Sequence, residues 1–247
     1  MLSFVYGALV SDDEVTTKPP TARERARVAL TADIKAAAHR QLAEVGAAAL
    51  SLRAVAREVG MVSSAVYRYF PSRDALLTAL IVDAFDAVGD AAEQEVARTT
   101  DQPFLPRWLA VTGAVRAWAR AHPEDYALVY GSPVPGYEAP RDTADPAARV
   151  SLAALRLVQD GLERGEIDPT STVELPDVVR GDLSRLRDTA APGVPDEVLA
   201  RTLLAWTAMY GGISYELFGH LHTVVDDHDA FFEAQMRRLG LLLAGAT

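Results

Sequence analysis

The residues best suited to chemistry lie in residues 63–69 (SSAVYRY), a short stretch that mixes hydroxyl groups with one guanidinium. Val66 and Phe70 share one helical face, so we expect them to be buried. The polar side chains that this leaves facing outward are Ser63, Ser64, Tyr67, Arg68 and Tyr69. Hydroxyl and guanidinium groups form hydrogen bonds with DNA phosphates and with base edges. The stretch therefore predicts a DNA-binding face.

Residues 51–77 are predicted to position this face as a helix, a tight turn and a second short helix, followed by a third helix. Ser51 is a good N-cap for the first helix. The apolar residues on one side of that helix are Leu52, Val55, Ala56 and Val59. Gly60 suits the left-handed position that ends it, and Ser63 is expected to cap the second helix. This is a helix-turn-helix, which places a short helix in the DNA major groove.

Pro71 ends the second helix, and Ser72 with Asp74 begins the third with a charge that suits the helix dipole. An ordinary corner between two helices would also need a glycine at the turn. Such a corner has little use for two tyrosines and an arginine on its exposed side. The exposed side therefore favours DNA binding over the corner.

The stretch from about Ala32 to Leu80 resembles the DNA-binding domain of the TetR family of transcriptional regulators. The residues that carry the resemblance are Gly46, Ser51-Leu52-Arg53, Val55-Ala56, Val59-Gly60, Val66-Tyr67, Tyr69-Phe70, Ser72-Arg73 and Ala75-Leu76-Leu77. They span about a fifth of the chain. Two later stretches, RAWARAHPEDYALVYGSPVPGYEAP and AWTAMYGGISYELFGHLH, are more loosely similar to the ligand domain of some actinobacterial members.

The resemblance implies an all-α fold, with an N-terminal three-helix helix-turn-helix domain followed by a larger helical ligand-binding and dimerisation domain. We expect a flexible N-terminal arm at 1–22, the DNA-binding domain at 23–78 and the second domain at 79–247. Residues 20–80 carry a net charge of +4, whereas residues 81–247 carry −12, within a total of −10. This asymmetry is typical of one face that meets nucleic acid and a body that faces away from it.

The DNA-facing residues receive separate roles. Arg53 is the best candidate for bidentate contact with a guanine. The other residues expected to face bases or lie beside them are Ser63, Ser64, Ala65 and Arg68. Phosphate contacts are expected from Tyr67, Tyr69 and Arg73. The basic residues Arg23, Arg25 and Arg27 are expected to follow the DNA backbone or minor groove as part of a mobile arm. The residues at positions Ala65 and Arg68 differ from those of many relatives. The operator sequence of a relative therefore cannot be assigned to this chain.

The last third of the chain predicts self-association. Six apolar residues at heptad-like spacing on one long helix are Leu199, Leu203, Trp206, Tyr210, Ile213 and Leu217. The spacing continues after a loop in Phe232, Met236, Leu239 and Leu243. Two such helices are able to pair with their copies as a four-helix bundle. TetR-like proteins dimerise through their last two long helices, so the resemblance favours a homodimer over two purely internal helices.

Aromatic residues between 104 and 218 predict a pocket for a small, mainly apolar molecule. The six residues expected to line it are Trp108, Trp118, Tyr126, Tyr130, Tyr210 and Phe218, and Tyr215 adds aromatic surface in the same stretch. The alternative is that most of these rings simply fill the core. The turn-rich segment from Gly131 to Pro146 is expected to be a mobile cover over the pocket.

Other chemistry finds little support. The sequence has no G-x-S-x-G, Walker A, G-x-G-x-x-G or H-E-x-x-H motif, so we expect neither an enzyme nor a cofactor. The one cluster with possible metal ligands is His220, His222, Asp226, Asp227 and His228. Its place at a helix end and in a polar loop favours a solvated connection, and no metal is expected.

Composition bears on the compartment and on where translation starts. The chain has no cysteine, so a reducing cytoplasm is the expected location. The N-terminal run LSFVYGALV is too short to span a bilayer, and no membrane contact is expected. We also expect translation to start at Val15, through a GTG codon read as methionine.

These observations together predict a cytoplasmic transcriptional regulator that binds a palindromic double-stranded operator as a homodimer. The expected mode is a repressor released by a small-molecule effector. The alternatives are a ligand-independent or architectural DNA-binding dimer and an activator of the same fold.

Overall fold

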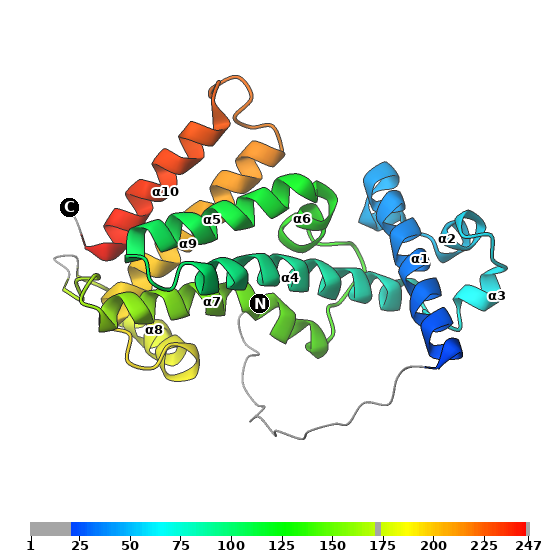
Figure 1. The fold of residues 1–247 in the computed structure, drawn as a ribbon, viewed down its shortest axis with the longest axis horizontal. Coiled ribbons are helices and arrows are strands. Elements are labelled where there is room, and N and C mark those ends of the chain that lie inside the picture. Colours follow the sequence, from blue (N-terminus) through cyan, green and yellow to red (C-terminus); the bar gives the residue numbers. More distant parts are fainter. Residues whose placement is uncertain (1–20, 171–173, 246–247) are drawn as a thin grey trace. The chain divides into compact units, whose positions relative to one another are not determined.

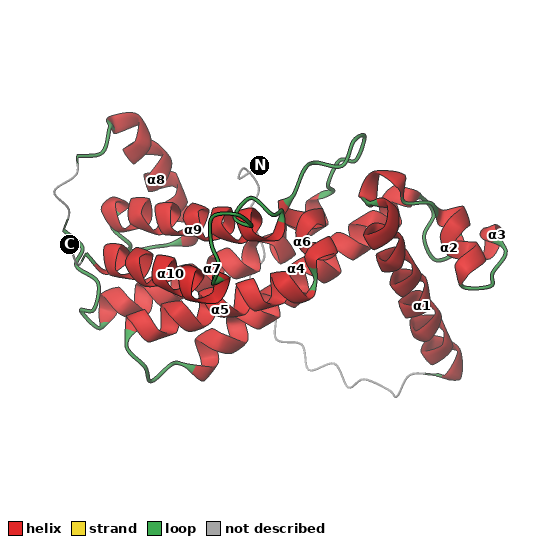
Figure 2. Ribbon diagram, turned by 90° about the horizontal axis from the view of Figure 1, so that it is seen from above, coloured by secondary structure: helices red, strands yellow, loops and turns green. Residues whose placement is uncertain are grey.

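A computed structural model describes residues 21–170 and 174–245, so the arm at 1–20 and the proposed start at Val15 lie outside the described residues. Helices and loops account for all of this part of the chain, with no strand (Figure 2). The helices that form or adjoin the DNA-binding motif are α1 (Ala22–Val45), η1 (Ala47–Ala49), α2 (Leu52–Glu58), α3 (Ser63–Val66) and α4 (Arg73–Arg98). The remaining helices are α5 (Phe104–Ala121), α6 (Pro123–Tyr130), η2 (Arg141–Thr143), α7 (Ala144–Glu163), α8 (Asp177–Ala190), α9 (Asp196–Leu217) and α10 (His228–Ala244) (Figure 1). The all-α fold class is thereby confirmed.

The helix-turn-helix forms as the sequence predicts. α2 ends before Gly60, whose φ of 68° is left-handed, and Val66 and Phe70 are buried. Ser72 Oγ accepts a hydrogen bond from the Ala75 backbone N–H at 3.0 Å, as a cap for α4 should. The expected cap at Ser63 is wrong by one residue, because Val62 is the N-cap of α3 and Ser63 already lies in the helix.

The first helix begins earlier than predicted. Arg23, Arg25 and Arg27 lie in the first turns of α1, so they do not form a mobile arm. The physical reason is a capping box, T-x-x-E, in which Thr21 Oγ1 accepts a hydrogen bond from Glu24 N–H and the Glu24 carboxylate accepts one from Thr21 N–H. This signal was present in the sequence and was overlooked.

The described residues divide into two compact units, which differ from the predicted domains. The first unit holds 21–84 together with 124–144, and the second holds 85–123 and 145–245. A boundary at 78/79 therefore misses the fact that α6 and the segment after it belong with the DNA-binding helices. Tertiary contacts from a distant part of the chain decide this, and no local sequence signal marks it.

Two side-chain contacts hold the 124–144 segment within the first unit. The Tyr137 and Thr78 hydroxyls lie 2.9 Å apart, and His39 Nδ1 lies 2.9 Å from Asp125 Oδ1. The first joins the segment to α4 and the second joins α6 to α1. The segment predicted to be a mobile pocket cover is thus tied down near its middle.

The second unit is centred on α5, against which α9 and α10 pack. Trp108 is 1% exposed and its Nε1 donates a hydrogen bond to Met236 O at 2.8 Å. A Cβ at Gly240 would lie 2.6 Å from Trp108 Cδ1 and 2.7 Å from Leu105 Cδ1. Only glycine therefore permits this close approach of α10 to α5.

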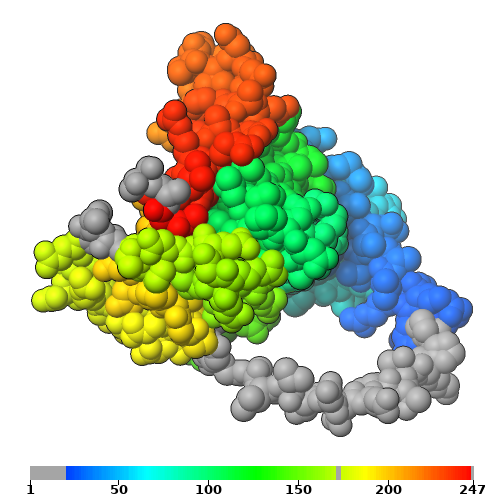
Figure 3. Space-filling view, turned by 60° about the vertical axis from the view of Figure 1, so that its left-hand side comes forward, coloured from blue at the N-terminus to red at the C-terminus, as the bar shows by residue number. Residues whose placement is uncertain are grey.

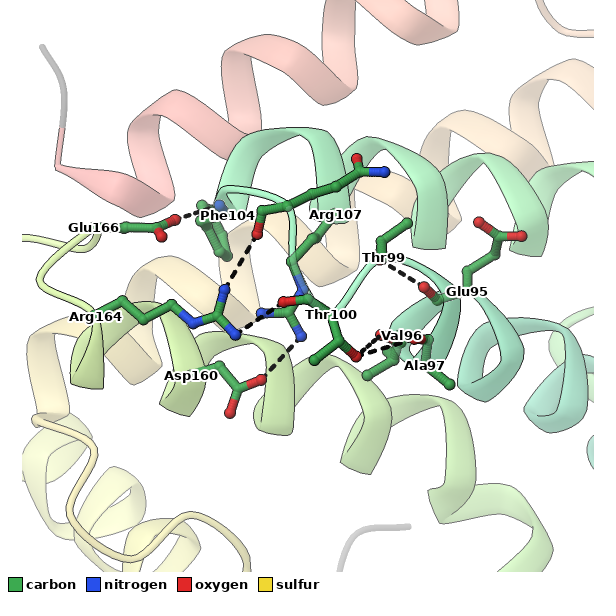
Figure 4. A network of polar contacts seen from close by, with 11 residues as sticks. Glu95, Val96, Ala97, Thr99, Thr100, Phe104, Arg107, Asp160, Arg164 and Glu166 are labelled. Atoms are coloured by element: carbon green, nitrogen blue, oxygen red, sulfur yellow. Dashed lines mark hydrogen bonds and ion pairs between the residues drawn. The ribbon is translucent and has the colours of Figure 1, made fainter.

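Polar contacts hold the connection between α4 and α5 to the end of α7 (Figure 4). Arg164 donates hydrogen bonds to Thr100 O and Gln102 O. The Nη2 atom of the buried Arg107 lies 2.9 Å from Asp160 Oδ2. The connection is short, since α4 ends at Arg98 and α5 begins at Phe104. Pro106 falls in the first turn of α5, where a missing backbone N–H costs no helical hydrogen bond.

An acidic stripe on α4 fixes α7 in the second unit. Arg149 of α7 donates hydrogen bonds to Asp86 and Glu93 and pairs with Asp90, contacts that raise its pKa. A Cβ at Gly89 would lie 2.9 Å from Arg149 Cβ. The glycine therefore lets the arginine lie across α4. Within the described residues, no helix is long and apolar enough to cross a membrane.

The His39–Asp125 contact predicts a pH-dependent fold stability. The hydrogen bond to Asp125 raises the pKa of His39, partial burial opposes this, and the Asp83 and Lys35 charges act in opposite senses. The folded pKa is raised, so the stabilisation is complete below about pH 6.5, the ordinary histidine value, and is lost as pH rises through the folded pKa. We expect His39→Gln to lower the urea midpoint more at about pH 5.5 than at about pH 8.5. Asp125→Asn should reproduce this pattern, and an equal loss at both values would contradict it.

Candidate nucleic-acid interface

α2 is held on α1 at both of its ends. Ser51 N–H, at its N-cap, donates to Oε1 of the buried Gln41 at 3.2 Å, and Arg40 pairs with Glu58 at its last residue. These contacts orient Arg53, which lies exposed in the first turn of α2. The contact of its guanidinium with a base edge stays a prediction.

α3 presents the predicted polar face. Its inner side is closed by Val66, which is 0% exposed, and by Phe70 just after the helix. On the outer side Ser64, Tyr67 and Arg68 are exposed, and Tyr67 retains 44% of its accessible surface. Ser63, Ala65 and Tyr69 are partly exposed. The structure thus brings hydroxyls, a methyl group and a guanidinium together on one surface, a combination suited to phosphates and base edges.

Tyr69 and Arg73 have partners inside the unit. The Arg27 guanidinium carbon Cζ lies 5.8 Å from the centre of the Tyr69 ring, within cation–π range. Arg73 Nη2 donates to Ala47 O at 2.8 Å and to Ala48 O at 3.2 Å. Arg73 therefore ties the turn after α1 to the start of α4, and its phosphate contact stays a prediction beside this structural role.

The residues predicted for an effector pocket belong to both units. Tyr126 and Tyr130 are in the first unit, with ring centres 5.1 Å apart, whereas Trp108 is packed between α5 and α10 in the second. Tyr210 contacts Trp206 edge-on, and Phe218 is 46% exposed. The six residues are thus divided between the two units, and a single pocket lined by all of them stays a prediction.

Trp118 remains the most informative of the six. It is 7% exposed and stacks on His122 with ring centres 5.6 Å apart. Its Nε1 is buried and has no hydrogen-bond partner among the described residues. An unmet buried donor is costly, which makes it a candidate contact for a bound molecule.

A groove of about 420 Å³ runs between α5 and α10 in the second unit. Its lining comprises Leu109, Ala110, Thr112, Gly113, Arg116, Asp229, Phe232, Glu233 and Met236. The Arg116 guanidinium lies 4.9 Å from the Phe232 ring centre and is hydrogen-bonded to Glu216 at 2.7 and 2.8 Å. None of the six predicted pocket aromatics lines this groove.

The eight residues predicted for the dimer interface do not share one exposed face. Those already buried within one chain are Leu199, Ile213, Phe232 and Met236. Those that keep exposed surface are Leu203, Trp206, Leu217 and Leu239. The first four are corrected to core residues, because their side chains pack inside their own unit.

A different set forms the exposed apolar surface of the last two helices. It comprises Leu203, Leu204, Tyr215 and Phe218 near or on α9 and Phe231, Leu241 and Leu242 on α10, each 36–57% exposed. Figure 3 shows α10, in red and orange, with much of its outer surface uncovered. Gly211 lies between Leu204 and Tyr215 on the same side of α9, and a Cβ there would meet nothing within 4 Å. In the described residues, no group of three or more His, Asp or Glu side chains is placed to hold a metal ion.

Family models match both units. One described as "Bacterial regulatory proteins, tetR family" matches residues 34–80, and one described as "Tetracyclin repressor-like, C-terminal domain" matches residues 108–239. The chain is 41% identical over 224 residues to the HTH-type transcriptional regulator Rv1816 of Mycobacterium tuberculosis (strain ATCC 25618 / H37Rv). The match covers 90% of this chain and 95% of that one.

Solved structures agree with this assignment. The crystal structure described as that of a regulatory protein, SCO4313, is 34% identical, with a TM-score of 0.74 over 89% of this chain and 98% of that one. The fold is also shared with a protein from Rhodococcus sp. RHA1, 24% identical with a TM-score of 0.64 over 87% and 94% of the two chains. The helix-turn-helix, the two family models and these relatives together place this chain in the TetR family of DNA-binding transcriptional regulators.

Proposed function

We propose that the protein is a cytoplasmic repressor that binds a palindromic operator as a homodimer and is released by a small, mainly apolar molecule. The observation that carries the proposal is the polar outer face of α3, with Ser64, Tyr67 and Arg68 exposed beside Arg53 of α2. This face has the groups needed for bases and for phosphates, and the clamped helices keep it in a fixed geometry.

We propose dimerisation because the recognition helix α3 is short. α3 has only 4 helical residues, so one copy contacts few base pairs. Two copies related by a two-fold axis would read both halves of a palindrome, spaced by roughly a helical turn or more. The exposed apolar surface of α9 and α10 supports a second copy as the partner, since such patches are typical of protein interfaces.

Release by a small molecule is proposed from Trp118. A ligand that offers one hydrogen-bond acceptor to its buried Nε1, and otherwise apolar surface to its ring, would satisfy both parts of the side chain. Such a ligand would favour a form of the dimer whose α3 helices are wrongly spaced for DNA. The shift is limited by the difference between its affinities for the two forms.

The DNA-binding face is tested with two variants. We expect Arg53→Ala to weaken binding to a selected operator by roughly 1–3 kcal/mol and to relax selectivity at one base pair. Tyr67→Phe removes only a hydroxyl and should weaken binding to specific and scrambled duplexes alike. Fluorescence anisotropy on both duplexes measures the effects. Unchanged affinity in both variants would refute the recognition face.

The dimer is tested by placing a charge on the exposed surface and, for comparison, in the core. We expect Leu204→Glu or Tyr215→Glu to give a monomer that is still folded, because a carboxylate would be buried only in the dimer. Ile213→Glu should instead destabilise the chain itself, since Ile213 is 0% exposed. Val178→Glu, at a 74% exposed apolar position on α8, is the matched control. Sedimentation at micromolar concentration decides, and a wild-type monomer would exclude the homodimer.

Ligand release is tested with Trp118→Phe, which keeps an aromatic ring but lacks Nε1. A screen of apolar small molecules should find compounds that raise the melting temperature of the wild type and weaken its operator binding. Both effects should be smaller in the variant. Stabilising compounds that leave DNA affinity unchanged would favour a ligand-independent DNA-binding dimer instead.

A further inference from the structure

The first turns of α1 are helical yet exposed to solvent. Every residue from 21 to 29 is exposed, including Val28 at 70%. In Figure 1 this dark-blue end of α1 continues past the α2–α3 pair. A helix usually owes its stability to a packed apolar face, which this end lacks.

The sequence nevertheless keeps this end helical and basic. The capping box between Thr21 and Glu24 supplies hydrogen bonds at the start of the helix. Within 21–29 there are three arginines and one glutamate, and the carboxylate of Glu24 is engaged by Thr21 N–H. The surplus charge is therefore positive and is carried on a defined helix.

Two of these arginines lie on the side of α1 that faces the helix-turn-helix. Arg27 precedes the fully buried Ile34 by seven residues, or about two turns, so the two share one face. Arg23 is a further four residues back on that face, about 6 Å along the axis. The cation–π contact of Arg27 with Tyr69 supports this direction, since Tyr69 lies three residues after the end of α3.

We propose that this end of α1 is a second DNA-contacting surface, in which Arg27 and Arg23 bind phosphates beside the groove that α3 enters. The inference rests on the proposed DNA-binding function and extends its contact area to a helix outside the helix-turn-helix. DNA is the partner, because the arginine row meets Tyr69, which lies three residues after the reading helix α3. Arg27 has a further part as a positioning residue, since its guanidinium holds the Tyr69 ring.

Phosphate contacts of this kind leave a distinct signature. They carry no base information, so their loss weakens binding to all sequences and lowers the salt dependence by about one unit of slope for each charge. A slope of about 0.9 per contact means that raising salt from about 50 to about 200 mM weakens binding about 3.5-fold for each contact. Base-reading side chains on α3 instead change selectivity.

The experiment uses the full chain and a duplex that the wild type selects from a randomised library, with a scrambled duplex beside it. We expect Arg23→Ala and Arg27→Ala each to weaken binding to both duplexes and to lower the salt slope by about one. Arg185→Ala removes an equally exposed arginine from α8 and should change neither quantity. Alanine is the best helix former, so α1 should stay helical in both variants.

Hydroxyl-radical footprinting then locates the contact. The wild type should protect sugars outside the stretch that α3 reads, and Arg23→Ala should lose only that outer protection. If both variants keep the wild-type slope and footprint while Arg68→Ala loses sequence selectivity, the α1 surface is refuted and the regulator function stands. If the wild type selects no duplex, both proposals fall.

Discussion

The DNA-reading face depends on the closure of one small apolar core in the first unit. Ile34 of α1, Val55 of α2, Val66 of α3 and Leu76 of α4 are all 0% exposed. A helix as short as α3 is not stable in water by itself, so its shape comes from this burial and from the turns on either side. The polar outer face is therefore rigid because the opposite face is buried.

The same unit also takes in a segment from later in the chain. α6 meets α1 through His39 and Asp125, and Tyr137 meets Thr78 of α4. The helices that present the reading face are thus braced by residues that follow α5. The brace is joined to the second unit along the chain, because α6 begins two residues after α5 ends.

In the second unit, α9 carries apolar residues on two different sides. On α9, Leu199 and Ile213 belong to the core, whereas Leu204 and Tyr215 are exposed. The first two residues are 14 positions apart and the second two are 11, and both separations return to the same side of a helix. Periodicity alone therefore cannot say which pair faces the core. On α10, the close approach at Gly240 identifies the side of the helix that packs against Trp108.

The sequence by itself determined the helix-turn-helix, its turn at Gly60, the start of α4 at Ser72 and the outward side chains of α3. Those features follow from backbone preferences and from spacing over a few residues, which act locally. The start of α1 was equally local, in Thr21 and Glu24, and was missed only because the basic residues suggested an arm. Tertiary structure alone decided that 124–144 joins the first unit and that Ile213 is core. These outcomes depend on which distant surfaces meet, and burial is a property of the packed chain that no short stretch of sequence contains.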